Sequence, residues 1–424
     1  MIAKNKGKAA TTAVALAVFF LLTIILEQVF SPTDKMSMLL TVLKKGAIYA
    51  LVAVSMNMLN GFTGLFSLGQ AGFMLIGAYS YAIFSIPLAE RESVYTYYDS
   101  AIRLSFPELL ENIMGGPGMV LGVIIAIILA GLIAAGVAFL VGLPVLRLKS
   151  DYLAIATLGF AEIIRAIIQW GRLGPVTNGS NPLRNYIRQN AFVIGIGNFT
   201  LSLSTFVIVF FVAVCIAIIV LLVNSSYGRA FKAIREDEVV AEAMGINLYR
   251  HKQLSFCISS FFTAIGGALL AIFMGTIIAS NFKAAMTYEF LLIVVLGGIG
   301  SISGSVIGAM LFVFASEWWL RGLDSGTFLG IHAPELFRNG FRLVVFSVII
   351  MLVVLFFRKG IMGDKELPYM LGYWKEKIVA APGAATGFLK DKLIPAIRMA
   401  PGRLKARFAG ITHGHGPKDG GNDG

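Results

Sequence analysis

Long apolar runs alternate with short polar segments along most of this chain. Crossing a hydrocarbon core of about 30 Å takes roughly 20 apolar residues in a helix, and most of the runs approach that length. The pattern predicts about ten membrane-spanning or re-entrant helices, at residues 11–30, 45–59, 66–87, 119–143, 152–170, 199–223, 254–278, 289–302, 304–320 and 341–357. The runs are too continuous for the alternating strands of a membrane barrel, so the predicted fold is all-α and polytopic.

Composition supports this class, because 57% of the residues are hydrophobic and only 14% are charged. An average soluble domain is less apolar and carries more charge. Cys215 and Cys257 both fall inside predicted spans, so neither a disulfide framework nor a metal site is expected. The first run follows three lysines, as a signal peptide does, but it is too long and lacks a convincing cleavage site. We therefore predict a retained first helix.

The distribution of Lys and Arg orients the predicted helices, since cytoplasmic loops are enriched in both. A lysine-rich start places the N-terminus inside, and alternation then places the polar segment 224–253 inside as well. The outer loop 88–118 holds two arginines against five acids, which agrees with this topology. The outer loop 171–198 holds three arginines and no acid, which runs against it.

A glycine-rich centre at residues 297–304 decides how many times the chain crosses. The tail after residue 357 carries twelve Lys or Arg against six acids, so it belongs inside. That requires two short or re-entrant elements over residues 289–320, with the glycine turn between them, rather than one long helix. In the alternative interpretation, the glycines simply allow close helix packing. Both termini are therefore expected on the cytoplasmic side.

A second glycine-rich segment has the same spacing as this one and suggests an internal repeat, with spans 2–5 and 7–10 as the halves. Interrupted helices at matching positions of two halves indicate a transport pathway near the midplane. The matching positions are Gly61, Gly64 and Ser67 in the first segment and Gly297, Gly300 and Ser303 in the second.

Ionisable residues inside spans are costly, so Glu162 and Arg165 in the fifth span are candidates for function. They stand three residues apart on one helix face, where they can neutralise each other and assemble the bundle, or border a polar pathway. Glu289 and Glu317, at span ends, keep a proton-coupled carrier open as an alternative. The complete candidate pathway set is Asn57, Asn60, Gly64, Ser67, Gln70, Glu162, Arg165, Gly297, Gly300 and Ser303.

The polar segment 224–253 is predicted to contain a short helix. Acids at residues 236–238 suit its first turn, and Gly245 stands where a C-terminal cap belongs. The chain has no phosphate-binding loop of the form GxxxxGK[ST], so it cannot hydrolyse ATP by that route. Zinc-protease and nucleophile-elbow motifs are missing too, and no enzyme activity is expected.

Four runs, in this order along the chain, resemble the high-affinity branched-chain amino acid ABC transporter permease family, LivM-like branch. They begin LNGFTGLFSLGQAGF, SDYLAIATLGFAEII, GRAFKAIREDEVVAEAMG and VVLGGIGSISG, at residues 59, 150, 228 and 294, and TNGSNPL follows the second at residues 177–183. The resemblance covers roughly residues 45–357. It implies an inner-membrane subunit that pairs with a homologous second permease, two cytoplasmic ATPases and a periplasmic binding protein delivering leucine, isoleucine or valine. ATP and Mg would be bound by the partner subunits, with no cofactor in this chain.

In such importers a loop helix of the permease docks in a groove of the ATPase, and the resemblance assigns that role to the polar segment. The family pattern of Glu-Ala-Ala before a glycine is met loosely, because residues 239–241 read Val-Val-Ala. A solvated loop without a partner is the alternative interpretation. The residues implied in ATPase coupling are Arg229, Arg235, Glu236, Asp237, Glu238, Ala241, Glu242, Ala243 and Gly245.

These observations divide the chain into an N-terminal extension with the first helix (1–44), a permease domain (45–357) and a basic cytoplasmic tail (358–424) whose end is disordered. Attraction of the tail's Lys and Arg to anionic lipid makes membrane tethering plausible. Three other functions stay open: a urea or short-amide ABC permease, an ion-coupled secondary amino acid carrier, and a membrane scaffold that transports nothing.

Overall fold

The structure is a computed structural model of the chain. It describes residues 23, 27, 37–148, 150–196, 199–319, 327–328, 331–332, 347–348, 351 and 360–363. The chain divides into two compact units, Met1–Asp364 and Lys365–Gly424, and the second lies outside the described residues.

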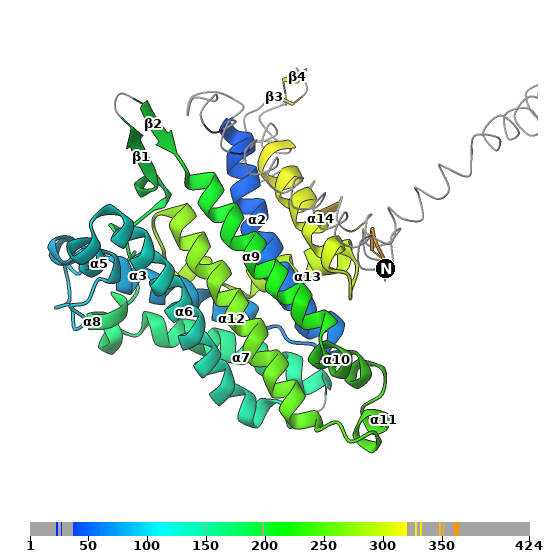
Figure 1. Ribbon diagram of the computed structural model, residues 1–424. Helices are drawn as coiled ribbons and strands as arrows, with labels where there is room; N and C mark the ends of the chain where they lie inside the picture. Colours follow the sequence, from blue (N-terminus) through cyan, green and yellow to red (C-terminus); the bar gives the residue numbers. More distant parts are fainter. Residues whose placement is uncertain are drawn as a thin grey trace, which may run out of the picture. The chain divides into compact units, whose positions relative to one another are not determined.

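Helices long and apolar enough to cross a membrane form the main part of the fold (Figure 1). Within the described residues there are five of them: α2 (Ser37–Asn57) with the π-helical turn η1 (Met58–Phe62), α6 (Gly116–Val145), α7 (Ser150–Gln169), α9 (Ser204–Asn224) and α12 (Leu248–Met274). A sixth candidate is α3 (Gln70–Ser85), which is followed after a bend of 103° by a short helical stretch over Leu88–Val94. The multi-pass, mainly helical architecture predicted from the sequence is therefore confirmed.

Two short helices cover most of residues 289–320, which were predicted to form two short elements. Helix α13 (Ala284–Gly297) and helix α14 (Ile302–Val313) are separated by a glycine turn, and a π-helical segment, η6 (Phe314–Trp319), continues α14. The span expected at residues 199–223 starts later, because Phe199–Ser202 forms a strand instead. The predicted first and last spans fall on residues that the structure describes only at isolated positions.

The remaining elements are short and lie in the connections between these helices. They are η2 (Leu88–Glu90), α4 (Arg91–Val94), α5 (Phe106–Met114), η3 (Gly171–Leu173), α8 (Gly174–Thr177), η4 (Gln189–Ala191), η5 (Ala279–Asn281) and the antiparallel pairs β1 (Val193–Ile196) with β2 (Phe199–Ser202) and β3 (Thr327–Phe328) with β4 (Ile331–His332). The two small hairpins were not predicted by the all-α interpretation.

Helix α12 is the central helix of the bundle, with 78% of its most apolar window buried against 28% for α7. It packs closely on α3 because both helices carry glycine at the crossing. A Cβ on Gly77 would lie 2.0 Å from the carbonyl oxygen of Ala264, and one on Gly267 would lie 2.0 Å from that of Met74. Small residues at such crossings let backbones approach, which is how helices gain packing energy in lipid.

Gly77→Ala is expected to destabilise the bundle by about 1–3 kcal/mol, because the new methyl must push the α12 backbone away from α3. The measurement is the thermal unfolding midpoint in detergent. Gly159→Ala on α7 is the matched control, since a Cβ there meets nothing within 4 Å. It should leave the midpoint unchanged or raise it slightly, as alanine favours helix. Equal midpoints for the two variants would contradict this account of the crossing.

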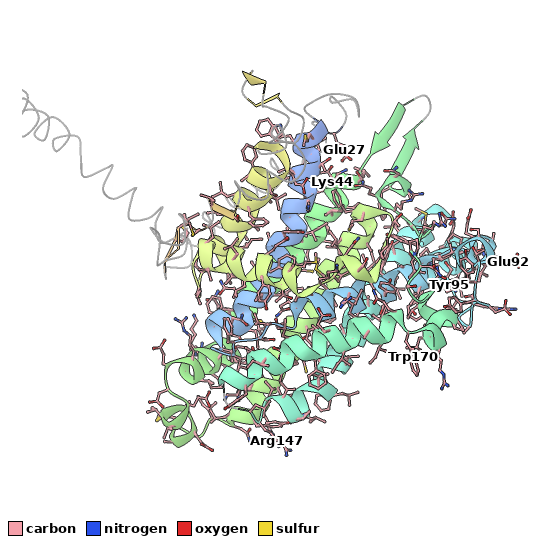
Figure 2. The ribbon with its side chains drawn as sticks, turned by 180° about the vertical axis from the view of Figure 1, so that it is seen from behind. Glu27, Lys44, Glu92, Tyr95, Arg147 and Trp170 are labelled. Atoms are coloured by element: carbon pink, nitrogen blue, oxygen red, sulfur yellow. The ribbon has the colours of Figure 1, made fainter. Side chains whose placement is uncertain are left out.

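Glu27 is one of the described residues of the N-terminal extension, and it joins two helices of the bundle. Lys44 on α2 lies 3.5 Å from its carboxylate, and the two side chains are seen together in Figure 2. The same carboxylate accepts hydrogen bonds from the Ser204 hydroxyl at 2.5 Å and the Thr205 backbone N–H at 3.0 Å. It therefore caps the start of α9, where an anion offsets the helix dipole.

Candidate coupling site and polar core

The two glycine-rich segments, far apart in sequence, meet in space. A Cβ on Gly61 would lie 2.7 Å from the backbone nitrogen of Gly300, so the pair tolerates no side chain there. Asn57, fully buried, joins the segments with its amide. It donates to the Ser301 carbonyl at 2.9 Å and to the Ser305 hydroxyl at 2.8 Å, and it accepts from the Gly300 N–H at 2.9 Å. These bonds satisfy backbone that has left the helix inside the bundle.

The unwound stretch between η1 and α3 is satisfied in a similar way. Asn60 accepts from the Ser67 N–H at 3.1 Å and donates back to the Ser67 carbonyl at 3.3 Å. The Leu68 N–H donates to the Thr157 hydroxyl on α7 at 2.9 Å. Two of the predicted pathway residues, Asn60 and Ser67, thus hold an irregular segment in shape.

Gly64 and Gly300, which occupy matching positions in the two segments, share two further properties. Both have positive φ, +76° and +91°, a conformation that favours glycine. Both also lie against Arg235, at the end of helix α10 (Ser226–Glu236): a Cβ on Gly64 would lie 3.3 Å from its Cα, and one on Gly300 would lie 2.8 Å from its Nη1. Arg235 Nη1 donates to the Gly61 carbonyl at 2.7 Å. One side chain of the polar segment therefore contacts both glycine turns.

Gln70, another predicted pathway residue, is buried in a network of hydroxyl groups at the start of α3. Its Oε1 accepts from the Thr263 hydroxyl at 2.6 Å, and its Nε2 donates to the Ser259 hydroxyl at 3.3 Å. The Ser55 hydroxyl lies 2.7 Å from that of Thr263, and Ser259 donates to the Ser55 carbonyl at 2.7 Å. The network ties α2, α3 and α12 together, as polar groups do between helices in membranes.

Glu162 and Arg165 form the predicted ion pair, with Arg165 Nε donating to Glu162 Oε2 at 2.8 Å. The second oxygen of Glu162 accepts from the Ala284 N–H at 3.3 Å. Glu162 therefore lies at the N-terminus of α13, where a carboxylate is favoured by the unpaired N–H groups and the dipole. Both side chains are partly exposed.

Gly297 and Ser303 mark the turn from α13 to α14. A Cβ on Gly297 would lie 2.3 Å from the Gly304 carbonyl oxygen, so the two helices cross at glycine. The Ser301 hydroxyl caps α14 by accepting from the Gly304 N–H at 3.1 Å, and it lies 3.4 Å from the Ser303 hydroxyl. The predicted pathway residues thus divide between the glycine turns, the polar core and the face of α7.

The polar segment forms two helices rather than one, α10 and then α11 (Glu238–Ala243), and they lie together beyond the end of α9 (Figure 1). Asp237 separates them because its side chain caps α11, accepting from the Val239 and Val240 N–H groups at 2.8 and 3.1 Å. Gly245, with φ of +84°, follows the end of α11, where a C-terminal cap was predicted. The backbone N–H of Ile246, which follows it, donates to the Ala241 carbonyl at 3.1 Å.

The outer surface of α11 is apolar as well as charged. Val239, Val240 and Met244 are 77%, 57% and 78% exposed. Ala241, by contrast, is buried, and Glu238 is held by Lys252 on α12 at 2.6 Å. The other implied coupling residues are exposed: Arg229, Arg235, Glu236, Asp237, Glu242, Ala243 and Gly245. Exposed apolar side chains rimmed by charge are typical of a docking surface.

Within the described residues, no group of three or more His, Cys, Asp or Glu is arranged to hold a metal ion. Comparison with known protein families shows which family the chain belongs to. Residues 38–357 match the model of a family described as "Branched-chain amino acid transport system / permease component". This chain belongs to that family. The family predicted from the sequence is confirmed, and the family description names a transport component, not an enzyme.

Individual relatives of this permease agree with the family match. LivM, the high-affinity branched-chain amino acid transport system permease protein, is 31% identical in Salmonella typhimurium and 30% in Escherichia coli K12, over 64% of this chain. The matched part spans 61% of the length of each of these two relatives. LivH of Salmonella typhimurium, a permease protein of the same description, is 26% identical over 76% of this chain and 93% of its own. No solved structure gives a significant match.

Sequence reasoning about this permease missed several residues of the site. Thr157, Ser259 and Thr263 carry hydroxyls within apolar runs, Ser259 beside Ser260, and nothing in their spacing marks them as part of a network. The exposed valines of α11 could have been found from the sequence. Val239 and Val240 interrupt an otherwise polar segment, at positions where the family pattern has other residues. Two adjacent apolar side chains in a polar helix indicate a contact surface.

Proposed function

We propose that this chain is the membrane-spanning permease subunit of an ATP-driven importer of branched-chain amino acids: leucine, isoleucine and valine. Its proposed location is the bacterial inner membrane, which it enters or crosses with ten helices. Both termini, and helices α10 and α11, lie on the cytoplasmic side in this proposal. The family match supports the class, and the five Lys or Arg of segment 224–253 support the orientation.

The proposed partners are a homologous second permease, two cytoplasmic ATPases and a periplasmic substrate-binding protein. Escherichia coli K12 has both LivM and LivH, and this chain resembles each of them, which supports a pair of related permeases. ATP and Mg²⁺ are bound by the ATPases in this proposal, and this chain needs no cofactor of its own. Substrate passes between the two permeases by alternating access.

The observation that carries the coupling proposal is the contact of Arg235 with both glycine turns. An ATPase docked on α11 moves α10 as the nucleotide-binding subunits close. Arg235 transmits that displacement to the Gly61 carbonyl, and Asn57 passes it on to Gly300. Backbone breaks held by a few hydrogen bonds change conformation at lower cost than a continuous helix. The matching glycine turns also support the proposed repeat of the two halves.

Val240→Asp is expected to lower ATP-driven leucine uptake by at least about tenfold, because a charge replaces an exposed apolar contact of the docking surface. Uptake is measured in proteoliposomes containing the whole complex. Val240→Ile, which keeps the surface apolar, is the matched control and should retain the wild-type rate. Retention of the rate by Val240→Asp would remove α11 from the coupling role.

The same preparation separates this function from its rivals. Leucine uptake driven by a proton or sodium gradient, with the ATPases left out, would establish a secondary carrier instead. Competition by urea or acetamide, with none by valine, would establish a short-amide permease. The proposed function expects neither, and it expects competition among leucine, isoleucine and valine.

A further inference from the structure

Helix α7 leaves one long face uncovered within this chain. Only 28% of its most apolar window is buried, the lowest share among the five candidate spans of the described residues. Leu153, Ala161 and Ile168 lie on its buried side. The opposite side carries exposed residues at intervals of three or four, which places them in one stripe along the helix. The stripe consists of Tyr152, Ile155, Gly159, Ile163, Ala166 and, directly after the helix, Trp170.

Charge distinguishes this face from the exposed faces of the other outer helices. Over its whole described length, neither α6 nor α9 contains a charged residue, as contact with lipid requires. Beside the α7 stripe, in contrast, the side chains of Glu162 and Arg165 are 39% and 26% exposed. Glu162 lies about 15 Å along the span from Tyr152. Their ion pair lowers the cost of charge at that depth, but the exposed parts of both side chains still need polar surroundings, which protein supplies and lipid does not.

Gly159 gives the centre of the stripe the shape of a helix contact. A Cβ there would meet nothing within 4 Å, so packing inside this chain does not explain the glycine. Gly72 on α3 is different, because a Cβ there would lie 2.8 Å from the Cα of Ala161 on the buried side of α7. Small residues let the backbone of a neighbouring helix approach closely in a membrane. The open space at Gly159 therefore fits a helix of another chain.

Among the proposed partners, only the second permease reaches this face. The ATPases are cytoplasmic and the binding protein is periplasmic in the proposed complex, so neither contacts the middle of a span. The face also adjoins both interrupted segments of this chain. Thr157 accepts from the Leu68 N–H of the unwound stretch at 2.9 Å, and Glu162 accepts from the first N–H of α13 at 3.3 Å.

We propose that the uncovered face of α7 is the surface on which the homologous second permease packs. A helix of that partner lies against Gly159, and polar groups of the partner lie beside Glu162 and Arg165. The inference rests on the proposed function for the identity of the partner. It adds the place on this chain where the two permeases meet, and it puts the transport pathway between them next to α7.

Photochemical cross-linking of the complete complex in nanodiscs tests this surface. Benzoylphenylalanine replaces Ile155, which is 69% exposed, and the products are identified by mass spectrometry. The expected product joins this chain to the second permease. The matched control is the same replacement at Ile218 on α9, which is 48% exposed and should give no permease product. A product from position 155 that joins two copies of this chain, no protein product there, or equal cross-linking from position 218 would overturn the proposal.

Gly159→Leu tests the helix contact itself. The leucine side chain occupies the space of the partner helix, so the amount of second permease that copurifies with this chain should fall severalfold. Gly136→Leu on α6 is the matched control, because a Cβ at Gly136 also meets nothing within 4 Å and its face is apolar. It should leave copurification unchanged, and neither variant should lower the thermal unfolding midpoint of the purified chain. Unchanged copurification in Gly159→Leu would contradict the contact at this glycine.

Leucine uptake by the wild-type complex separates failure of this surface from failure of the proposed function. Normal ATP-driven uptake without a permease cross-link from position 155 rejects only the surface. A cross-link to the second permease in a complex that takes up no leucine supports the surface and rejects the proposed function. Full ATP-driven uptake by a complex that lacks a second permease rejects the surface together with the proposed pairing.

Discussion

Arg235→Ala is expected to lower ATP-driven leucine uptake by roughly ten- to a hundredfold while the complex continues to hydrolyse ATP. The reason is that Arg235 holds the Gly61 carbonyl through a charge-assisted hydrogen bond, and such bonds contribute about 1.5–3 kcal/mol. Each 1.4 kcal/mol corresponds to about a factor of ten in rate. Without this side chain, movement of α10 no longer reaches the glycine turns, so hydrolysis and transport are uncoupled.

The measurement is the ratio of leucine transported to ATP hydrolysed in proteoliposomes. Arg235→Lys keeps one donor and should give an intermediate ratio, because lysine lacks the planar fork of the guanidinium group. Arg250→Ala is the matched control: it removes an exposed arginine from the first turn of α12 and should leave the ratio unchanged. A wild-type ratio in Arg235→Ala would show that coupling takes another route.

Asn57→Ala is expected to have the largest effect on stability. It leaves the Gly300 N–H and the Ser301 carbonyl without the bonds that Asn57 supplies, at a cost of about 1–3 kcal/mol for each buried group. The thermal unfolding midpoint in detergent should fall by several degrees, and uptake should fall with it. Asn57→Asp does not rescue it, because a carboxylate cannot donate to Ser301.

The matched control for this variant is Asn224→Ala, at the exposed end of α9, where surface substitutions change stability by no more than about 0.5 kcal/mol. An unchanged midpoint for Asn57→Ala would mean that the two glycine segments are held together by other contacts. A lower midpoint in Asn57→Ala with full uptake would limit Asn57 to a structural role.

Much of the helical framework was predictable, because apolar length is a direct physical requirement of a membrane span. The runs at 119–143 and 254–278 correspond to α6 and α12, and the glycine turn before α14 followed from counting charges in the tail. Helix α10 was missed since Ser225, Ser226 and Gly228 resemble a loop. Serine and glycine favour helix only weakly, but packing of the buried side chains of Phe231 and Ile234 stabilises the helix here.

The functional contacts were less accessible to sequence reasoning. Arg235 was expected among the polar contacts to an ATPase, and that role stays a prediction; the residue is exposed, and its guanidinium group donates to the Gly61 carbonyl. An arginine in a polar helix can face water or a carbonyl group equally well, and only the fold decides between them. Asn57 and Gln70 were expected to border a pathway, and that role stays a prediction, while their hydrogen bonds fasten helices together. Polar residues in spans serve both purposes, so type and spacing do not distinguish them.

The contact of Asn57, Gly61, Arg235 and Gly300 has a consequence for how this protein evolves. A side chain at Gly61 would displace both Asn57 and Gly300, and a longer or shorter residue at 235 would alter the space above Gly300. A substitution at one of these four positions is therefore viable only with a compensating change at another. We therefore expect the four positions to vary together among relatives, although they are spread over more than half of the chain.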